Sequence, residues 1–167
     1  MNQLFSAIVY AAILVTSTVA QSVPAGSIVQ IHSAQNNLCL GAVAGTQQSE
    51  ILLEPCSSDL TTFILTAGTS TAATQIELVG NATGQPALCI TAAQSQAGNT
   101  PVILQACQDD PFSRWRFEAG KGTGEIVSTA STNGQFCLTA VGSNQGDPVE
   151  FRSCTGAANQ EWTTVVQ

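Results

Sequence analysis

The chain has 167 residues, of which only 9% are charged, against about 25% in an average soluble domain. Its 11 acidic and 4 basic residues leave a net charge of −7, so it carries too few cations to neutralise many phosphates. This balance argues against nucleic-acid binding and against attraction to an anionic membrane surface. The length fits a single domain.

The first 20 residues are predicted to be a secretory signal peptide. An apolar run of 11 residues, Phe5–Val15, leads to the small residues Thr18-Val19-Ala20, which is typical of a cleavage site. The run is shorter than the 18 or so residues that span a bilayer, so we expect no membrane anchor. The sequence thus predicts cleavage before Gln21 and an extracellular location. The alternative is a buried N-terminal strand or helix.

The rest of the chain, 21–167, is predicted to form one domain of three repeats. The motif apolar-Cys-Leu/Ile-x-Ala occurs three times, at 38–42, 88–92 and 136–140. An apolar-x-apolar-x-x-Cys pattern follows each copy. One aromatic residue follows that pattern in each repeat, at Phe63, Trp115 and Trp162. Another short β-type segment precedes each copy, at 28–31, 76–79 and 125–127. The repeats are expected at about 24–68, 69–119 and 120–167.

These segments predict an all-β domain. They are short, alternate between apolar and polar residues, and are separated by turn signals such as Asn99-Thr100-Pro101 and Gly146-Asp147-Pro148. No amphipathic helical stretch of convincing length interrupts them. The three equivalent aromatics are predicted to pack in the core.

Six cysteines allow fifteen pairings, but their equal spacing within the repeats singles out one. It joins Cys39 with Cys56, Cys89 with Cys107, and Cys137 with Cys154. Each closed loop of this length stabilises the fold by about 3 kcal/mol in the loop-entropy model. A zinc site is not predicted, because there is no C-x-x-C pair and the only histidine, His32, is expected on a strand face. No metal or cofactor is expected.

The threefold unit, with its Cys-Leu entry, its V-x-L/F-x-x-Cys strand and a terminal Gln160-Glu161-Trp162, resembles the ricin B-chain type of lectin domain, also called the family 13 carbohydrate-binding module. The resemblance covers nearly all of residues 24–167. It implies a β-trefoil of twelve strands with pseudo-threefold symmetry, one disulfide in each repeat, and a carbohydrate-binding function.

The resemblance also implies where a sugar should bind, and there the sequence departs from the family. Lectins of this type carry an aspartate directly after Cys-Leu, whereas this chain has Gly41, Thr91 and Thr139. Losing the carboxylate should weaken the usual pocket roughly tenfold or more. Repeats 1 and 2 are therefore predicted to be structural. Repeat 3 keeps the most polar set, and its candidate sugar-binding residues are Thr139, Asp147, Glu150, Asn159 and Gln160.

The sequence thus predicts a secreted, monomeric protein that binds glycans weakly through repeat 3 and is not an enzyme. One alternative is a trefoil that has lost sugar binding and acts as a protein-binding module, such as a protease inhibitor or a host-interaction protein. Another is a small hydrolase that uses Asp109, Asp110 or Glu118, although Asp109-Asp110-Pro111 is typical of a turn.

Asn81-Ala82-Thr83 is an acceptor sequence for N-glycosylation and lies in a Gly- and Pro-rich stretch. In a eukaryotic host it predicts a glycoprotein modified at Asn81. The alternative is an ordinary polar turn.

Overall fold

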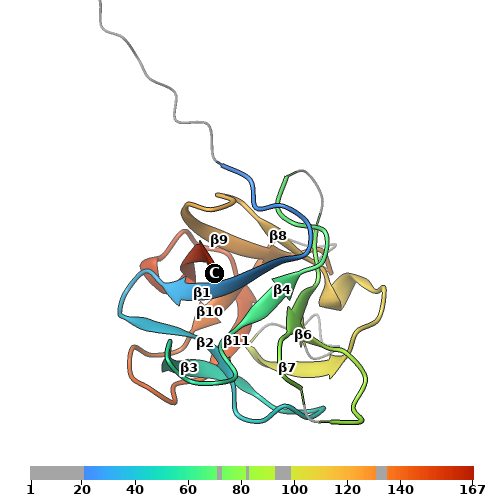
Figure 1. Ribbon diagram of the computed structural model, residues 1–167. Coiled ribbons are helices and arrows are strands. Elements are labelled where there is room, and N and C mark those ends of the chain that lie inside the picture. Colours follow the sequence, from blue (N-terminus) through green and yellow to red (C-terminus); the bar gives the residue numbers. More distant parts are fainter. Residues whose placement is uncertain (1–20, 71–72, 82, 93–98, 131–134) are drawn as a thin grey trace, which may run out of the picture.

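The computed structural model describes residues 21–70, 73–81, 83–92, 99–130 and 135–167, and the predicted signal peptide lies outside them. Within these ranges the chain forms twelve strands and two 3-10 turns, η1 and η2 (Figure 1). Repeat 1 contains β1 (Ser27–Ser33), β2 (Leu38–Ala42), β3 (Ile51–Pro55) and β4 (Phe63–Leu65). Repeat 2 contains β5 (Ile76–Leu78), β6 (Leu88–Ala92), β7 (Thr100–Ala106), η1 (Pro111–Ser113) and β8 (Trp115–Phe117). Repeat 3 contains β9 (Thr123–Ser128), β10 (Phe136–Ala140), β11 (Val149–Ser153), η2 (Ala158–Gln160) and β12 (Glu161–Val166).

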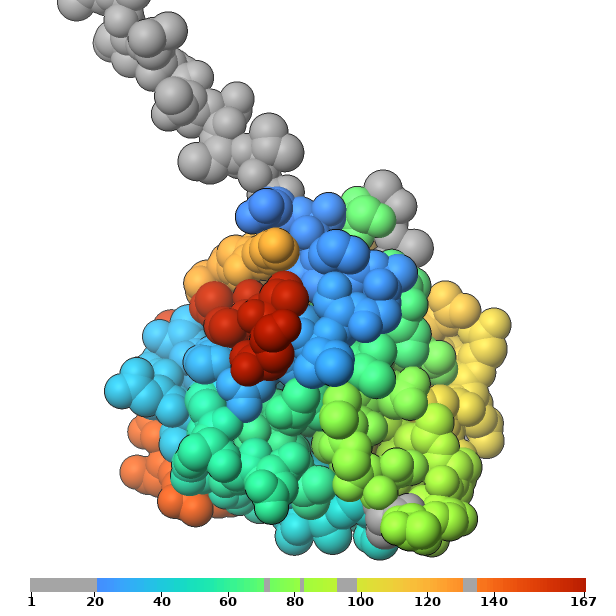
Figure 2. Space-filling view, in the orientation of Figure 1, coloured from blue at the N-terminus to red at the C-terminus, as the bar shows by residue number. Residues whose placement is uncertain are grey.

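Six of the strands close into a barrel. β1 pairs with β12 from Val29 to Ser33 and with β4 on its other side, β4 pairs with β5, and β12 and β8 both pair with β9. The ring closes where Thr74, just before β5, and Trp115 exchange two backbone hydrogen bonds of 2.8 Å. The last strand therefore lies beside the first, and Figure 2 shows the C-terminal residues on the surface against β1.

The other six strands form three hairpins, β2/β3, β6/β7 and β10/β11, each paired over five positions. The hairpins also bridge one another. Glu50 beside β3 pairs with Ile103 of β7, Leu52 of β3 pairs with Pro148, and β7 pairs with β11. A barrel with three mutually bridged hairpins is the pseudo-threefold trefoil that the sequence led us to expect, so the all-β prediction is confirmed.

The equivalent aromatics lie in the core, as predicted. Phe63 and Trp115 are fully buried and Trp162 nearly so. Each indole N–H also has a hydrogen-bond partner. Trp115 Nε1 donates to the Ile90 carbonyl at 2.9 Å, and Trp162 Nε1 donates to the Leu138 carbonyl at 3.0 Å. The tryptophans thus fasten the barrel to the hairpin strands β6 and β10.

All three predicted disulfides are present, one in each repeat. Each joins the first strand of a hairpin to the residue just after its second strand. The first cysteine of every pair is fully buried, and the second is half-buried. No helix in the described ranges is long and apolar enough to cross a membrane.

The segment before β1 is held against the loop that follows β4. Val23 is buried, its N–H donates to Thr69 Oγ1 at 2.7 Å, and its carbonyl accepts from the Thr69 N–H at 2.9 Å. Gly68 makes this close approach possible, because a Cβ at Gly68 would overlap the Val23 carbonyl oxygen. Gly26, at the end of the segment before β1, has a similar left-handed backbone, with a φ of +74° against +68° at Gly68. It differs in that a Cβ at Gly26 would meet no neighbouring atom.

These two glycines give a matched test of the docked segment. Gly26→Ala should lower the free energy of unfolding by about 1–2 kcal/mol, from the left-handed backbone alone. Gly68→Ala should cost at least about twice as much, because it adds a steric overlap to the same backbone strain. Urea denaturation of both variants measures the difference, and equal losses would contradict the packing described for Val23.

Candidate functional site

The position directly after Cys-Leu, where lectins of the ricin B type carry an aspartate, is buried in every repeat. Gly41, Thr91 and Thr139 lie in β2, β6 and β10, and all three are buried. Thr91 Oγ1 donates to the Cys89 carbonyl at 3.3 Å, and Thr139 Oγ1 donates to the Cys137 carbonyl at 3.2 Å. Both hydroxyl protons are therefore used inside the strand and are not offered to a ligand.

Gln160, one of the predicted sugar-binding residues, is a buried amide at the centre of a hydrogen-bond network in repeat 3. Its Nε2 donates to Thr139 Oγ1 at 2.9 Å and to the Ser153 carbonyl at 2.8 Å. Its Oε1 accepts from the backbone N–H and the hydroxyl of Thr155, at 2.7 and 2.9 Å. Gln160 is 2% exposed, so this amide holds β10 and β11 together and has no atom left for a sugar.

The other predicted residues of repeat 3 divide into two places. Glu150 is paired opposite Thr139, and Asn159 Nδ2 donates to the Ala140 carbonyl at 2.9 Å, so the structure brings these side chains to one edge of β10. The Glu150 side chain is 19% exposed, and its carboxylate forms an ion pair of 2.8 Å with Arg152. This edge therefore has one partly exposed carboxylate, which is already paired with the Arg152 guanidinium.

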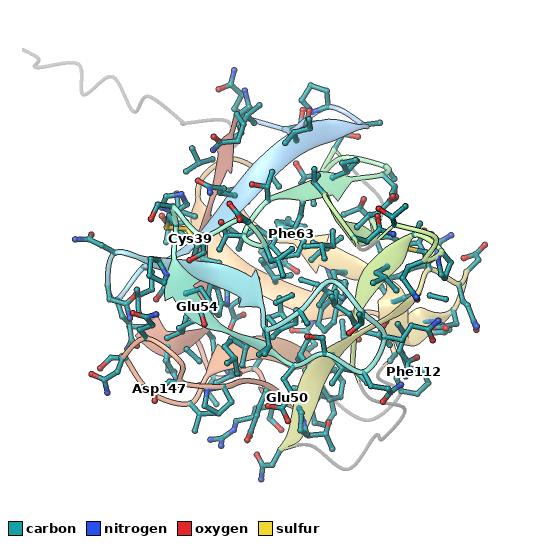
Figure 3. All side chains as sticks on the ribbon, turned by 60° about the horizontal axis from the view of Figure 1, so that its bottom comes forward. Cys39, Glu50, Glu54, Phe63, Phe112 and Asp147 are labelled. Carbon is teal, nitrogen blue, oxygen red and sulfur yellow. A yellow bond between two sulfur atoms is a disulfide. The ribbon has the colours of Figure 1, made fainter. Side chains whose placement is uncertain are left out.

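Asp147 lies apart from this edge, in the turn that joins β10 to β11. Its Oδ2 accepts from the Asn144 backbone N–H at 2.8 Å and so closes the turn. Its carbonyl accepts from the Leu53 N–H at 2.9 Å, which places the turn against repeat 1. In Figure 3, Asp147 lies on the same side of the molecule as Glu54, and Gln145 of this turn donates to Glu54 Oε2 at 3.4 Å.

A hollow of about 380 Å³ lies on repeat 1. Its lining includes positions at which the resemblance to ricin B-type lectins implies sugar binding. Leu52 stands four residues before the second cysteine of the repeat, Glu54 stands two before it, and Leu60 takes the place of the asparagine in Asn-Gln-x-Trp. All three line the hollow, together with Asp59 and Ser58. We call this the repeat 1 hollow.

Gly41 explains how a carboxylate reaches the repeat 1 hollow without an aspartate after Cys-Leu. A Cβ on Gly41 would lie 2.8 Å from Glu54 Cβ and 2.9 Å from its Cγ, so the Glu54 side chain occupies the space that a side chain at 41 would need. The acid is therefore supplied by the neighbouring strand β3. This site is not among those predicted from the sequence, although Gly41 together with Glu54 was the available signal.

The repeat 1 hollow has the chemistry of a shallow sugar site. The carboxylates of Glu54 and Asp59 can each accept hydrogen bonds from neighbouring hydroxyls. Val43, which is 59% exposed, adds an apolar surface beside them, with Leu52 and Leu60. A carboxylate next to an apolar surface can orient a hydroxylated ring and cover its C–H face.

The carboxylates considered for hydrolysis are bound to their own neighbours. Asp110 Oδ1 accepts from the backbone N–H groups of Phe112 and Ser113 and caps η1, which confirms the predicted turn. Asp109 forms an ion pair with Arg114, and Glu118 forms one with Arg116.

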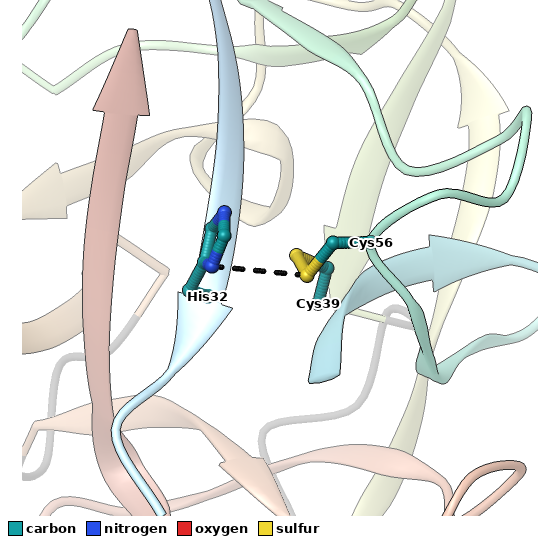
Figure 4. A group of neighbouring side chains, drawn as sticks. All are labelled: His32, Cys39 and Cys56. Atoms are coloured by element: carbon teal, nitrogen blue, oxygen red, sulfur yellow. Dashed lines mark hydrogen bonds between the residues drawn. A yellow bond between two sulfur atoms is a disulfide. The ribbon is translucent and has the colours of Figure 1, made fainter. Parts of the chain in front are cut away.

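His32 lies beside the first disulfide, with Nδ1 3.7 Å from Cys56 Sγ (Figure 4). Burial lowers the pKa of His32 below its usual value of 6.5. A ring nitrogen of His32 and the sulfur atoms of Cys39 and Cys56 lie within 4.8 Å of one another, but both sulfur atoms belong to a disulfide and are not the thiolates that bind metals.

Asn81 is half-buried, and its Nδ2 donates to the Pro86 carbonyl at 2.7 Å. Thr83 of the acceptor sequence is exposed, whereas Ala82 lies outside the described residues. Modification at Asn81 stays a prediction.

Solved structures similar to this chain share its fold at low sequence identity. A designed threefold symmetric protein, ThreeFoil, has a TM-score of 0.69 at 16% identity, over 84% of this chain and 99% of its own. The ricin B-like lectin of Macrolepiota procera, solved in complex with lactose, has a TM-score of 0.64 at 17% identity, over 88% and 100%. The Polyporus squamosus lectin, solved with Neu5Acα2-6Galβ1-4GlcNAc, has a TM-score of 0.66 at 16% identity, over 85% of this chain but only 49% of its own.

Similar folds also occur as parts of longer proteins. An exo-β-1,3-galactanase from Clostridium thermocellum matches with a TM-score of 0.73 at 14% identity, and this chain corresponds to 31% of its length. No curated protein matches the sequence. The family described as ricin-type beta-trefoil lectin domain matches residues 78–167, which is more than half of the chain. Together with the trefoil of three disulfide-closed repeats, this match shows that the chain belongs to the ricin-type β-trefoil lectin family.

Proposed function

We propose that this protein is a secreted lectin that binds a glycan weakly, and that it does so through the repeat 1 hollow. The observation that carries the proposal is the placement of Glu54 over Gly41, which brings a carboxylate to the family's sugar position from a different strand. Secretion is supported by the three disulfides, since such bonds persist mainly in oxidising compartments.

The edge of repeat 3 is the alternative site for the same function. It carries Glu150 and Asn159, but Thr139 and Gln160 are buried beneath it and bonded to each other. The Glu150 carboxylate already faces Arg152, so a sugar hydroxyl would have to compete with an ion pair. The repeat 1 hollow offers two carboxylates, and for this reason we prefer it.

One shallow hollow predicts a modest affinity. A dissociation constant near 1 mM corresponds to about −4 kcal/mol, which a few hydrogen bonds and one apolar contact can supply. Tight attachment to a glycan surface would then need several copies acting together. The lactose and Neu5Acα2-6Galβ1-4GlcNAc bound by the similar lectins make galactosides the first probes to use.

The site assignment is tested with three double variants in a lactose titration and on a glycan array. Glu54→Gln with Asp59→Asn should weaken binding tenfold or more, because each change replaces a charged acceptor by a neutral one at about 1 kcal/mol. Asp109→Asn with Glu118→Gln removes the same charge from repeat 2 and should leave the affinity unchanged. Glu150→Ala with Asn159→Ala should also leave it unchanged.

The outcomes separate the possible functions. If the repeat 3 variant loses binding and the repeat 1 variant keeps it, the sugar binds at Glu150 and Asn159 instead. Unchanged binding in all three variants would place the sugar elsewhere on the chain. Wild-type protein that binds no glycan on the array contradicts the lectin function, and inhibition of a protease panel by the same protein would then favour a protein-binding module.

The structural role of Gln160 can be tested separately from binding. Gln160→Ala should lower the free energy of unfolding by about 2–4 kcal/mol, because it removes all four hydrogen bonds of this buried amide, to Thr139, Ser153 and Thr155, and the Thr139 hydroxyl among these groups is itself buried. Asn159→Ala removes a half-buried amide that makes one hydrogen bond, and it should cost only about 1 kcal/mol. Chemical denaturation gives both values, and a Gln160→Ala protein of wild-type stability would reopen a ligand-binding role for Gln160.

A further inference from the structure

A second hollow lies on the outside of the barrel where repeats 1 and 3 meet. Its volume is about 700 Å³, and we call it the junction hollow. Its lining includes His32, Asn36, Asn37, Thr123, Thr163 and Val165. It involves none of the positions after Cys-Leu, before the second cysteine, or in the Asn-Gln-x-Trp motif that define the family's sugar site.

The strand register builds one wall of the junction hollow. His32 of β1 is paired with Thr163 of β12, which is paired in turn with Thr123 of β9. The side chains of Thr123 and Thr163 meet there, with their hydroxyl oxygens 2.6 Å apart. Side chains of the alternate positions, such as Ile31 and Trp162, point into the core. Three adjacent strands thus present polar side chains on one outer face.

The turn between β1 and β2 and the first disulfide line the rest of the junction hollow. Ala34 and Asn37 are exposed, and Cys56 lies beside His32, as Figure 4 shows. Asn36 is tied into the fold, since its Oδ1 accepts from the Leu38 N–H at 2.9 Å. Asn37, in contrast, makes no side-chain hydrogen bond within the described residues, so its amide is available to a ligand.

The lining has no charged side chain, although the whole chain has a net charge of −7. His32 is its one titratable group, and burial lowers the pKa of His32, so the ring is neutral at neutral pH. The Nε2 atom of His32 is buried without a hydrogen-bond partner in the described part of the chain. An ion would find no countercharge here, whereas the amide and hydroxyl groups of the lining can both donate to and accept from the hydroxyl groups of a ligand.

From this chemistry we propose that the junction hollow is a second binding site for a neutral saccharide. Asn37, Thr123 and Thr163 supply hydrogen bonds to its hydroxyls, and Val165 with Ala34 covers a C–H face. The site extends the proposed lectin function and does not depend on the repeat 1 hollow, because the two hollows share no lining residue.

The test is a titration of the ¹⁵N-labelled protein with lactose and with methyl glycosides of galactose, glucose, mannose and N-acetylglucosamine, followed by amide chemical shifts. At least one sugar should produce saturable shifts at Asn37, Thr123 and Thr163. The Glu54→Gln, Asp59→Asn variant should keep these shifts while it loses those around the repeat 1 hollow. Shifts at only one hollow therefore support one site and contradict the other.

Ala34→Phe should fill the junction hollow and weaken its binding at least about tenfold, whereas Ala87→Phe, at an exposed alanine of repeat 2, should change it less than about twofold. Asn37→Ala removes a single exposed amide without adding bulk, and it should weaken binding about two- to tenfold. The proposal is overturned if no sugar gives saturable shifts at the junction hollow. It is equally overturned if the shifts there survive both Ala34→Phe and Asn37→Ala at wild-type affinity.

Discussion

The first strand of each hairpin is buried on both faces, and the rest of the structure depends on this. β6 is buried at all five positions, and β2 and β10 at four of five. A polar group in such a strand must find its partner inside the protein, since an unpaired one costs about 1–3 kcal/mol. The hydroxyls of Thr91 and Thr139 donate to carbonyls of their own strands, and Gly41 has no side chain that needs a partner.

Because of this burial, polar residues at equivalent positions of the repeats differ in whether a ligand can reach them. Repeat 3 has the fullest set of polar residues at the family positions, but two of them, Thr139 and Gln160, satisfy each other in the interior. Repeat 1 has a glycine where an acid is expected, and the absence of a side chain there makes room for Glu54 from β3. Repeat 1, which lacks an acid directly after Cys-Leu, therefore still carries a half-buried carboxylate beside that position, from Glu54.

The sequence sufficed for the fold because the fold rests on features that recur at fixed spacing. The cysteine pairs are 17, 18 and 17 residues apart, and an aromatic residue follows each pair, which indicates three equivalent units. In the structure each unit has its own disulfide, and the three aromatics are buried. The candidate site depends instead on a contact between two neighbouring strands, in which the side chain of one covers a glycine of the other. Glu54 reaches over Gly41 only because β2 and β3 pair in one particular register, and spacing along the chain does not reveal that.

One symmetric scaffold can carry unlike surfaces, because equivalent positions of the three repeats hold different side chains. The residue paired with the first half-cystine is His32 in repeat 1, Glu77 in repeat 2 and Val127 in repeat 3. The cysteines opposite them are identical and fully buried, because the core tolerates little change in volume. The facing position is half-buried in repeats 1 and 2, so a neutral ring and a carboxylate are both accommodated there. Core positions thus preserve the threefold fold, whereas the position facing the first cysteine is buried only in repeat 3 and differs in each repeat; in repeat 1 it contributes His32 to the junction hollow.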